Sequence, residues 1–68
     1  MTNQRIYITV PSGERVRTAH SRRYFIVCDP PFGKPFVVMR TDNLAVARRT
    51  VKGWTYRHLY DSATETFL

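Results

Sequence analysis

The sequence predicts an α+β fold, in which an antiparallel sheet of three to five strands packs on one helix. Two observations carry this prediction. Segments rich in β-branched and aromatic residues, separated by Pro, Gly and Asp, are typical of strands joined by turns. Between two of these segments, one stretch changes to the spacing of an amphipathic helix. The expected order of elements is β-(β)-β-β-α-β, with the second strand optional.

The first half of the chain contains two strand patterns after a polar tail at residues 1–4. Residues 5–10 alternate apolar and polar side chains, which is the period of a half-buried strand. Residues 22–28 carry apolar side chains on both faces, so both faces need cover. Between them, residues 14–21 form either a short strand, with Arg15 and Arg17 sharing one face, or an ordered loop.

Residues 35–40 are expected to form the next strand, paired antiparallel with residues 22–28 through a short Pro- and Gly-containing loop. One helix can cover only one face of this sheet. The other face is therefore expected to stay open and to bind a protein partner or a second copy of the chain in a homodimer. That face consists of either Phe25, Val27, Val37 and Met39, or Tyr24, Ile26, Phe36 and Val38.

The helix is expected between residues 41 and 53. Thr41 or Asp42 can cap its start, because a short side-chain oxygen accepts a hydrogen bond from a first-turn amide. Gly53 supplies a left-handed stop. A strand at residues 54–61, a turn and a short final strand at residues 66–68 follow. The apolar stripe of the helix consists of Leu44, Ala47 and Val51.

The chain has 68 residues and is expected to form one small domain, residues 1–68. A domain of this size buries about 60% of the surface that its unfolded chain exposes. Its single cysteine, Cys28, excludes an internal disulfide and is expected to be a small buried apolar residue. No signal-peptide pattern or apolar run of bilayer length is recognisable, so a cytoplasmic protein without membrane contact is expected.

The charge of the chain points to an anionic partner. Eleven Lys and Arg stand against five Asp and Glu, which gives a formal charge of +6. Nucleic acid is the commonest such partner, although the charge can also serve solubility alone. Arginine beside aromatic residues suits phosphate contact combined with base stacking. The candidate contacts are Arg15, Arg17, Arg22 and Arg23 around the first half of the sheet, and Arg48, Arg49, Lys52 and Arg57 at or near the helix end.

A host protein is the alternative partner. Phe32 lies at the tip of the Pro-rich loop, where an exposed aromatic ring can anchor a partner, unless it folds back on the sheet. Cys28, His20 and His58 lie on separate segments without a flanking motif, so no catalytic site is predicted and the protein is expected not to be an enzyme. No paired metal-ligand spacing is present, and neither a metal nor a cofactor is expected.

The second half of the chain contains an extended motif. Two strands are followed by V-x-R-[ST]-D-x-L-x-x-A-R and then by a strand that ends in Y-D-x-x-T. The matching residues are Val38, Arg40, Thr41, Asp42, Leu44, Ala47, Arg48, Tyr60, Asp61 and Thr64. This pattern resembles small accessory proteins of actinobacterial phages and related mobile elements, although Glu65 stands where such sequences usually place glycine. The resemblance implies a phage-type origin and a non-enzymatic binding role, and it transfers no site residue.

Overall fold

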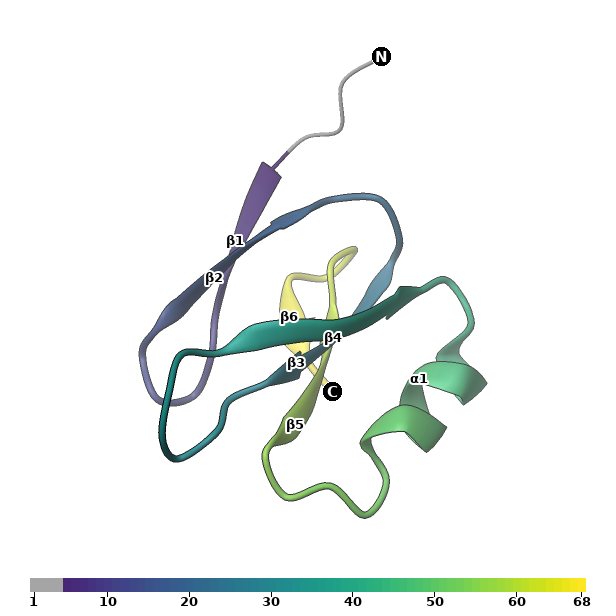
Figure 1. Cartoon of the computed structure of the whole chain (residues 1–68). Coiled ribbons are helices and arrows are strands. Elements are labelled where there is room, and N and C mark those ends of the chain that lie inside the picture. Colours follow the sequence, from purple (N-terminus) through teal and green to yellow (C-terminus); the bar gives the residue numbers. More distant parts are fainter. Residues whose placement is uncertain (1–4) are drawn as a thin grey trace.

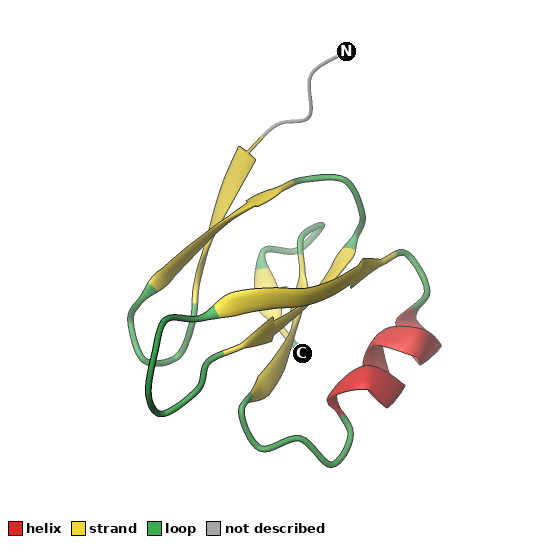
Figure 2. Ribbon diagram, in the orientation of Figure 1, coloured by secondary structure: helices red, strands yellow, loops and turns green. Residues whose placement is uncertain are grey.

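The computed structural model describes residues 5–68, which form six strands and one helix (Figures 1 and 2). The polar tail expected at residues 1–4 lies outside the described residues. The elements are β1 (Arg5–Thr9), β2 (Arg15–Ala19), β3 (Tyr24–Cys28), β4 (Phe36–Thr41), α1 (Leu44–Val51), β5 (Arg57–Asp61) and β6 (Thr66–Phe67). They form a β1–β2 hairpin and a four-stranded antiparallel sheet of order β4-β3-β5-β6. The predicted α+β class and order of elements are confirmed, and the optional second strand is β2.

The four-stranded sheet lies between two layers, a hairpin and a helix. The β1–β2 hairpin packs on one face and α1 on the other, so the fold has three layers (Figure 1). Strand β3 accounts for this arrangement, because its side chains are buried on both faces. Phe25 and Val27 join the hairpin-side core, whereas Tyr24 and Ile26 join the helix-side core. The hairpin-side core consists of Ile8, Val10, Val16, Phe25, Val27 and Tyr60, and the helix-side core of Tyr24, Ile26, Ala47 and Leu59.

The expectation that one sheet face stays open is therefore wrong. The hairpin does not extend the sheet edge but folds over the face that carries Phe25 and Val27, and Val37 also packs against this core. Both apolar faces of β3 are thus used within the chain. A homodimer or a protein complex through an open sheet face loses the physical basis on which it was predicted.

A bulge in β4 also changes which side chains share a face. The register pairs Ile26 with Met39 and leaves Val38 as an extra residue. Val38 packs against the helix-side core, and the Thr50 hydroxyl on α1 donates to the Met39 sulfur at 3.6 Å. Val38 and Met39 therefore both lie on the helix side, whereas simple alternation placed them on opposite faces.

The start of α1 differs from the prediction, because Asn43 and not Thr41 or Asp42 is its cap. The Asn43 side-chain oxygen accepts a hydrogen bond from the Val46 amide at 3.2 Å. Thr41 Oγ1 accepts from the Asn43 amide at 3.1 Å. The Asp42 carboxylate instead accepts a hydrogen bond from the Arg23 amide at 2.8 Å. Because this contact with a distant segment engages the carboxylate, Asp42 does not cap the helix.

The C-terminal end of α1 follows the prediction. Gly53 has a φ of +80°, a conformation that glycine adopts without the steric cost of a Cβ. The Trp54 amide then donates to the Val51 carbonyl at 3.1 Å, which closes the turn after the helix. Within residues 5–68, no helix has the length and apolar character needed to cross a membrane.

Two further corrections concern the start of β5 and the burial of Cys28, and one confirmation concerns the final strand. Strand β5 begins at Arg57 and not at residue 54, so that Trp54 and Tyr56 are exposed in the preceding loop. Cys28 is half-buried, less deeply than expected. The predicted final strand is present as β6, which pairs with β5 through a turn in which Glu65 has a φ of +57°.

Candidate nucleic-acid interface

The arginine and lysine side chains that were predicted to contact nucleic acid lie in three separate regions of the structure. Arg15 and Arg17 lie on the hairpin, with their side chains exposed. Arg22 and Arg23 lie before β3, in intramolecular ion pairs. The remaining ones lie on the opposite side of the sheet, on α1, directly after it and at the start of β5, namely Arg48, Arg49, Lys52 and Arg57.

The Arg23 side chain is held by a carboxylate. Its Nε and one terminal nitrogen donate to the two carboxylate oxygens of Asp61, each at 3.0 Å, in a bidentate pair. Asp61 is only 3% exposed, and the hydrogen bond from Arg23 holds the pKa of this carboxyl below its usual value. Arg22 forms a more exposed pair with Asp42 at 3.3 Å. Arg23 thus has a structural role in the junction between β3 and β5, whereas the exposed Arg22 pair contributes little to stability.

The outward surface of the β1–β2 hairpin is basic. Alternation along both strands turns Ile8 and Val16 into the core and leaves Arg5, Arg15 and Arg17 exposed. Tyr7, 56% exposed, lies in the same surface and pairs across the hairpin with Arg17. The Arg15 guanidinium stands 5.0 Å from the centroid of the Tyr7 ring. We call this surface, formed by Arg5, Tyr7, Arg15 and Arg17, the hairpin face.

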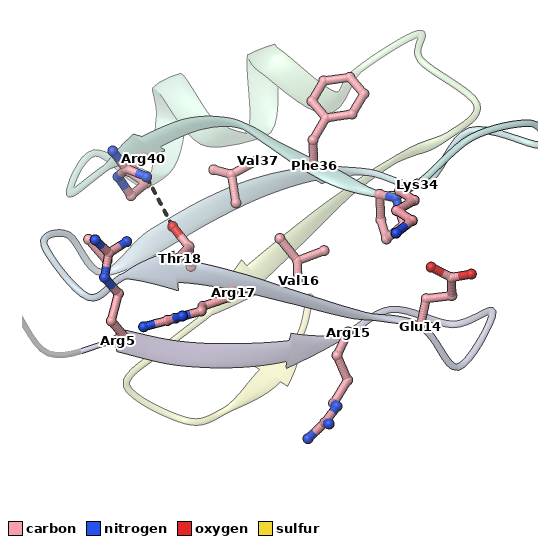
Figure 3. A pocket seen from close by; sticks show the side chains of 12 residues that line it. Arg5, Glu14, Arg15, Val16, Arg17, Thr18, Lys34, Phe36, Val37 and Arg40 are labelled. Carbon is pink, nitrogen blue, oxygen red and sulfur yellow. Dashed lines mark hydrogen bonds between the residues drawn. The ribbon is translucent and has the colours of Figure 1, made fainter.

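A groove of about 410 Å³ adjoins the hairpin face, between β2 and the edge strand β4 (Figure 3). Arg40 from β4 reaches across it and donates to the buried Thr18 hydroxyl at 3.0 Å. Figure 3 shows Arg5, Arg17 and Arg40 at one end of the groove and Lys34 near its other end. Tertiary packing thus adds cations from β4 and from the loop before it to those of the hairpin.

Five cations and one carboxylate line this groove. The carboxylate is Glu14, directly before β2, and the others of the described chain lie outside the lining. Like charges gathered on one concave surface create a positive potential that attracts phosphate. The cations are Arg5, Arg15, Arg17, Lys34 and Arg40.

Three of these cations were absent from the predicted set. Arg5 was detectable in the sequence, because it occupies an outward position of an alternating strand whose inward positions are apolar. Lys34 and Arg40 carried no such signal. They join the site only because β4 lies beside β2, two strands that are not hydrogen-bonded partners.

A second group of cations lies at the C-terminal end of α1. Arg48, Lys52 and Arg57 line a shallow cavity of about 400 Å³, whereas Arg49 lies outside it. Arg57 donates to the Thr50 carbonyl at 3.1 Å, which satisfies a carbonyl of the last helical turn. Its guanidinium also stands 3.9 Å from the centroid of a Trp54 ring that is 59% exposed. We call Arg48, Lys52 and Arg57 the helix-end cluster.

The Phe32 side chain is exposed, at 90% of its surface, in the loop between β3 and β4. Of the two alternatives that the sequence allowed, the ring on the solvent side is the one observed. An exposed aromatic ring on a loop that contains three prolines is a suitable anchor for a protein partner.

The residues considered for catalysis have separate surroundings. His20 Nε2 lies 3.2 Å from the Ser62 hydroxyl, and the His58 ring packs edge-on against Phe67. Over residues 5–68, no three His, Cys, Asp or Glu side chains come together in a way that could hold a metal ion.

Known proteins offer no guide to this surface. No protein-family model matches the chain, and neither a curated protein nor a solved structure does. The function is therefore inferred from the sequence and from the described structure.

Proposed function

We propose that this protein binds nucleic acid, without chemical catalysis, through the hairpin face and the adjoining groove. The observation that carries the proposal is the gathering of five cations and a single carboxylate on the hairpin face and around the adjoining groove. In this proposal the protein is a small phage-type accessory protein, as the resemblance of its second half implies, and it acts in the cytoplasm of a bacterial host.

The chemistry of the surface suits phosphate. Four of the five cations are arginines, whose planar guanidinium groups donate to two phosphate oxygens at once. Each phosphate that is neutralised releases condensed counterions, so affinity falls as salt rises. Tyr7 adds a ring that is exposed on the same surface and can stack on a base in a single strand. A two-stranded ribbon such as β1–β2 also fits the major groove of a duplex.

Fluorescence-anisotropy titrations with short duplex DNA and single-stranded RNA, at low and near-physiological salt, test this proposal. The double variant Arg15→Ala/Arg17→Ala is expected to bind more weakly. Its plot of log affinity against log salt should be shallower by about 1.8 for duplex DNA, because two phosphate contacts are lost.

The matched control is Arg22→Ala/Arg49→Ala, which removes the same two charges from the formal +6 but lies outside the groove. It should keep most of the affinity and the salt slope. Equal losses in the two variants would show that net charge and not this surface determines binding. An absence of binding at low salt would overturn the proposal.

A second function, binding of a host protein, is favoured by the exposure of Phe32. In this alternative the loop aromatic anchors the partner, and the positive charge directs the protein to an acidic surface. Phe32→Ala would then abolish capture of the partner from host lysate and leave nucleic-acid affinity unchanged. The sheet face that was expected to assist this contact is buried under the hairpin.

A further inference from the structure

The hairpin face and the helix-end cluster belong to opposite outer layers of the fold. The hairpin packs on one side of the four-stranded sheet and α1 on the other, as the two cores show (Figure 1). Arg15 and Arg17 therefore lie on one side of the molecule, and Arg48 and Lys52 on the other. The sequence of α1 contains no carboxylate that would neutralise its side.

The two groups of cations are electrostatically separate. A sheet layer stands about 10 Å from the layer packed on it, and here the helix adds a further layer on the far side. The Debye length is about 8 Å at physiological ionic strength, so dissolved ions screen the interaction between charges on the two outer surfaces, which act independently. Each surface thus presents its own attraction to phosphate.

The helix-end cluster combines the same groups as the hairpin face. In both places an arginine stands over an exposed aromatic ring, Arg15 over Tyr7 at 5.0 Å and Arg57 over Trp54 at 3.9 Å. The C-terminal end of a helix carries only about half a negative charge. The cluster has three cations, so a positive surface remains.

We propose that one molecule contacts two duplex segments at once, one on the hairpin face and one on the helix-end cluster, and so bridges them. This inference rests on the proposed function. A duplex is stiff over about 50 nm, so a segment docked on the hairpin cannot bend around so small a protein to reach the helix. The second surface is then available to another segment.

Energy transfer between two short DNA duplexes, one labelled with a donor and the other with an acceptor, tests this bridging. Transfer is expected to rise as protein is added, to peak near one protein for two duplexes, and to fall in excess protein. The fall follows from mass action, because each duplex then carries its own protein molecule.

Three double variants with the same formal charge distinguish the outcomes. Arg48→Ala/Lys52→Ala and Arg15→Ala/Arg17→Ala should each still bind one duplex in anisotropy but reduce transfer to the level of duplexes alone. Arg22→Ala/Arg49→Ala should retain transfer. Transfer that survives Arg48→Ala/Lys52→Ala would overturn the inference, since bridging would then arise from self-association or from net charge.

Binding of the unaltered protein to one duplex without any transfer would also overturn the inference while leaving the proposed function intact. No binding to any nucleic acid would overturn the proposed function itself. Anisotropy reports binding and energy transfer reports bridging, so the two failures are distinguishable.

Discussion

At the scale of single residues, the buried carboxylate of Asp61 decides the role of the nearest arginine. The carboxylate accepts two hydrogen bonds from Arg23 and one from the Ala63 amide, at 3.0 Å each. A buried carboxylate without such partners would be costly. Arg23 is thus needed to hold the end of β5 against β3, and its charge is largely used within the molecule.

This pair predicts an acid-sensitive contribution to stability. The pKa of Asp61 is lowered in the folded state, chiefly by the hydrogen bond from Arg23. Its contribution is therefore complete above the unfolded pKa of about 3.9 and is lost as pH falls through the folded value. Asp61→Asn should lower the melting temperature at neutral pH and reduce the further loss of stability below about pH 4.

Thermal unfolding followed by circular dichroism between neutral pH and pH 3 checks this prediction. Asp29→Asn is the control, because Asp29 lies in the loop after β3 and forms no ion pair among the described residues. If the two Asn variants melt alike across the pH range, the Arg23 pair does not stabilise the fold.

At the scale of elements, two turns each require a residue with positive φ, and the chain places different residue types there. After α1, the left-handed position is filled by Gly53; in the turn between β5 and β6 it is filled by Glu65. An L-residue in this conformation places its Cβ close to the backbone, at a cost of about 1–2 kcal/mol. The terminal hairpin thus forms in spite of its turn residue.

Glu65→Gly should therefore stabilise the protein. Part of the gain is offset by the larger backbone entropy of glycine, so we expect the free energy of unfolding to rise by about 0.5–1 kcal/mol. Urea denaturation measures this change. Glu65→Ala removes the same charge but keeps a Cβ, and it should change stability by less than about 0.5 kcal/mol. An equal gain in both variants would assign the effect to charge.

At the scale of the whole molecule, the hairpin is the layer that completes the core. Ile8 is 1% exposed and Ile26 is 0% exposed, although they belong to opposite cores. A small domain has few such residues, and its total stability is expected to be modest. The inward side chains of the hairpin therefore complete the core, and its outward side chains form the hairpin face.

Ile8→Ala is expected to cost about 2–5 kcal/mol, similar to Ile26→Ala, because both changes leave a cavity in a closed core. Thr9→Ala, on the outward side of the same strand, should change stability by less than about 0.5 kcal/mol. Chemical denaturation compares the three variants. A cost for Ile8→Ala as small as that for Thr9→Ala would mean that the hairpin does not pack as a core layer.

The sequence by itself determined the elements and their class. Alternation identified β1, the doubly apolar pattern identified β3, and the apolar stripe with Gly53 identified the helix and its end. These patterns are local, since they follow from the period of a strand or a helix and from the conformational freedom of glycine. The outward position of Arg15 and Arg17 on a strand was also one of the two options that the sequence allowed.

Tertiary structure alone decided what covers each face and which cations meet. Nothing local in the sequence indicates that the hairpin folds over the sheet. An apolar strand face predicts that the face is buried, but it does not identify the element that packs on it. Three contacts illustrate this, each between residues at least 19 positions apart: Arg23 with Asp61, Arg40 with Thr18, and the Arg23 amide with Asp42. The last of these occupies the Asp42 carboxylate, and Asn43 caps the helix instead. Such contacts are set by the packing of whole layers, which a local pattern does not encode.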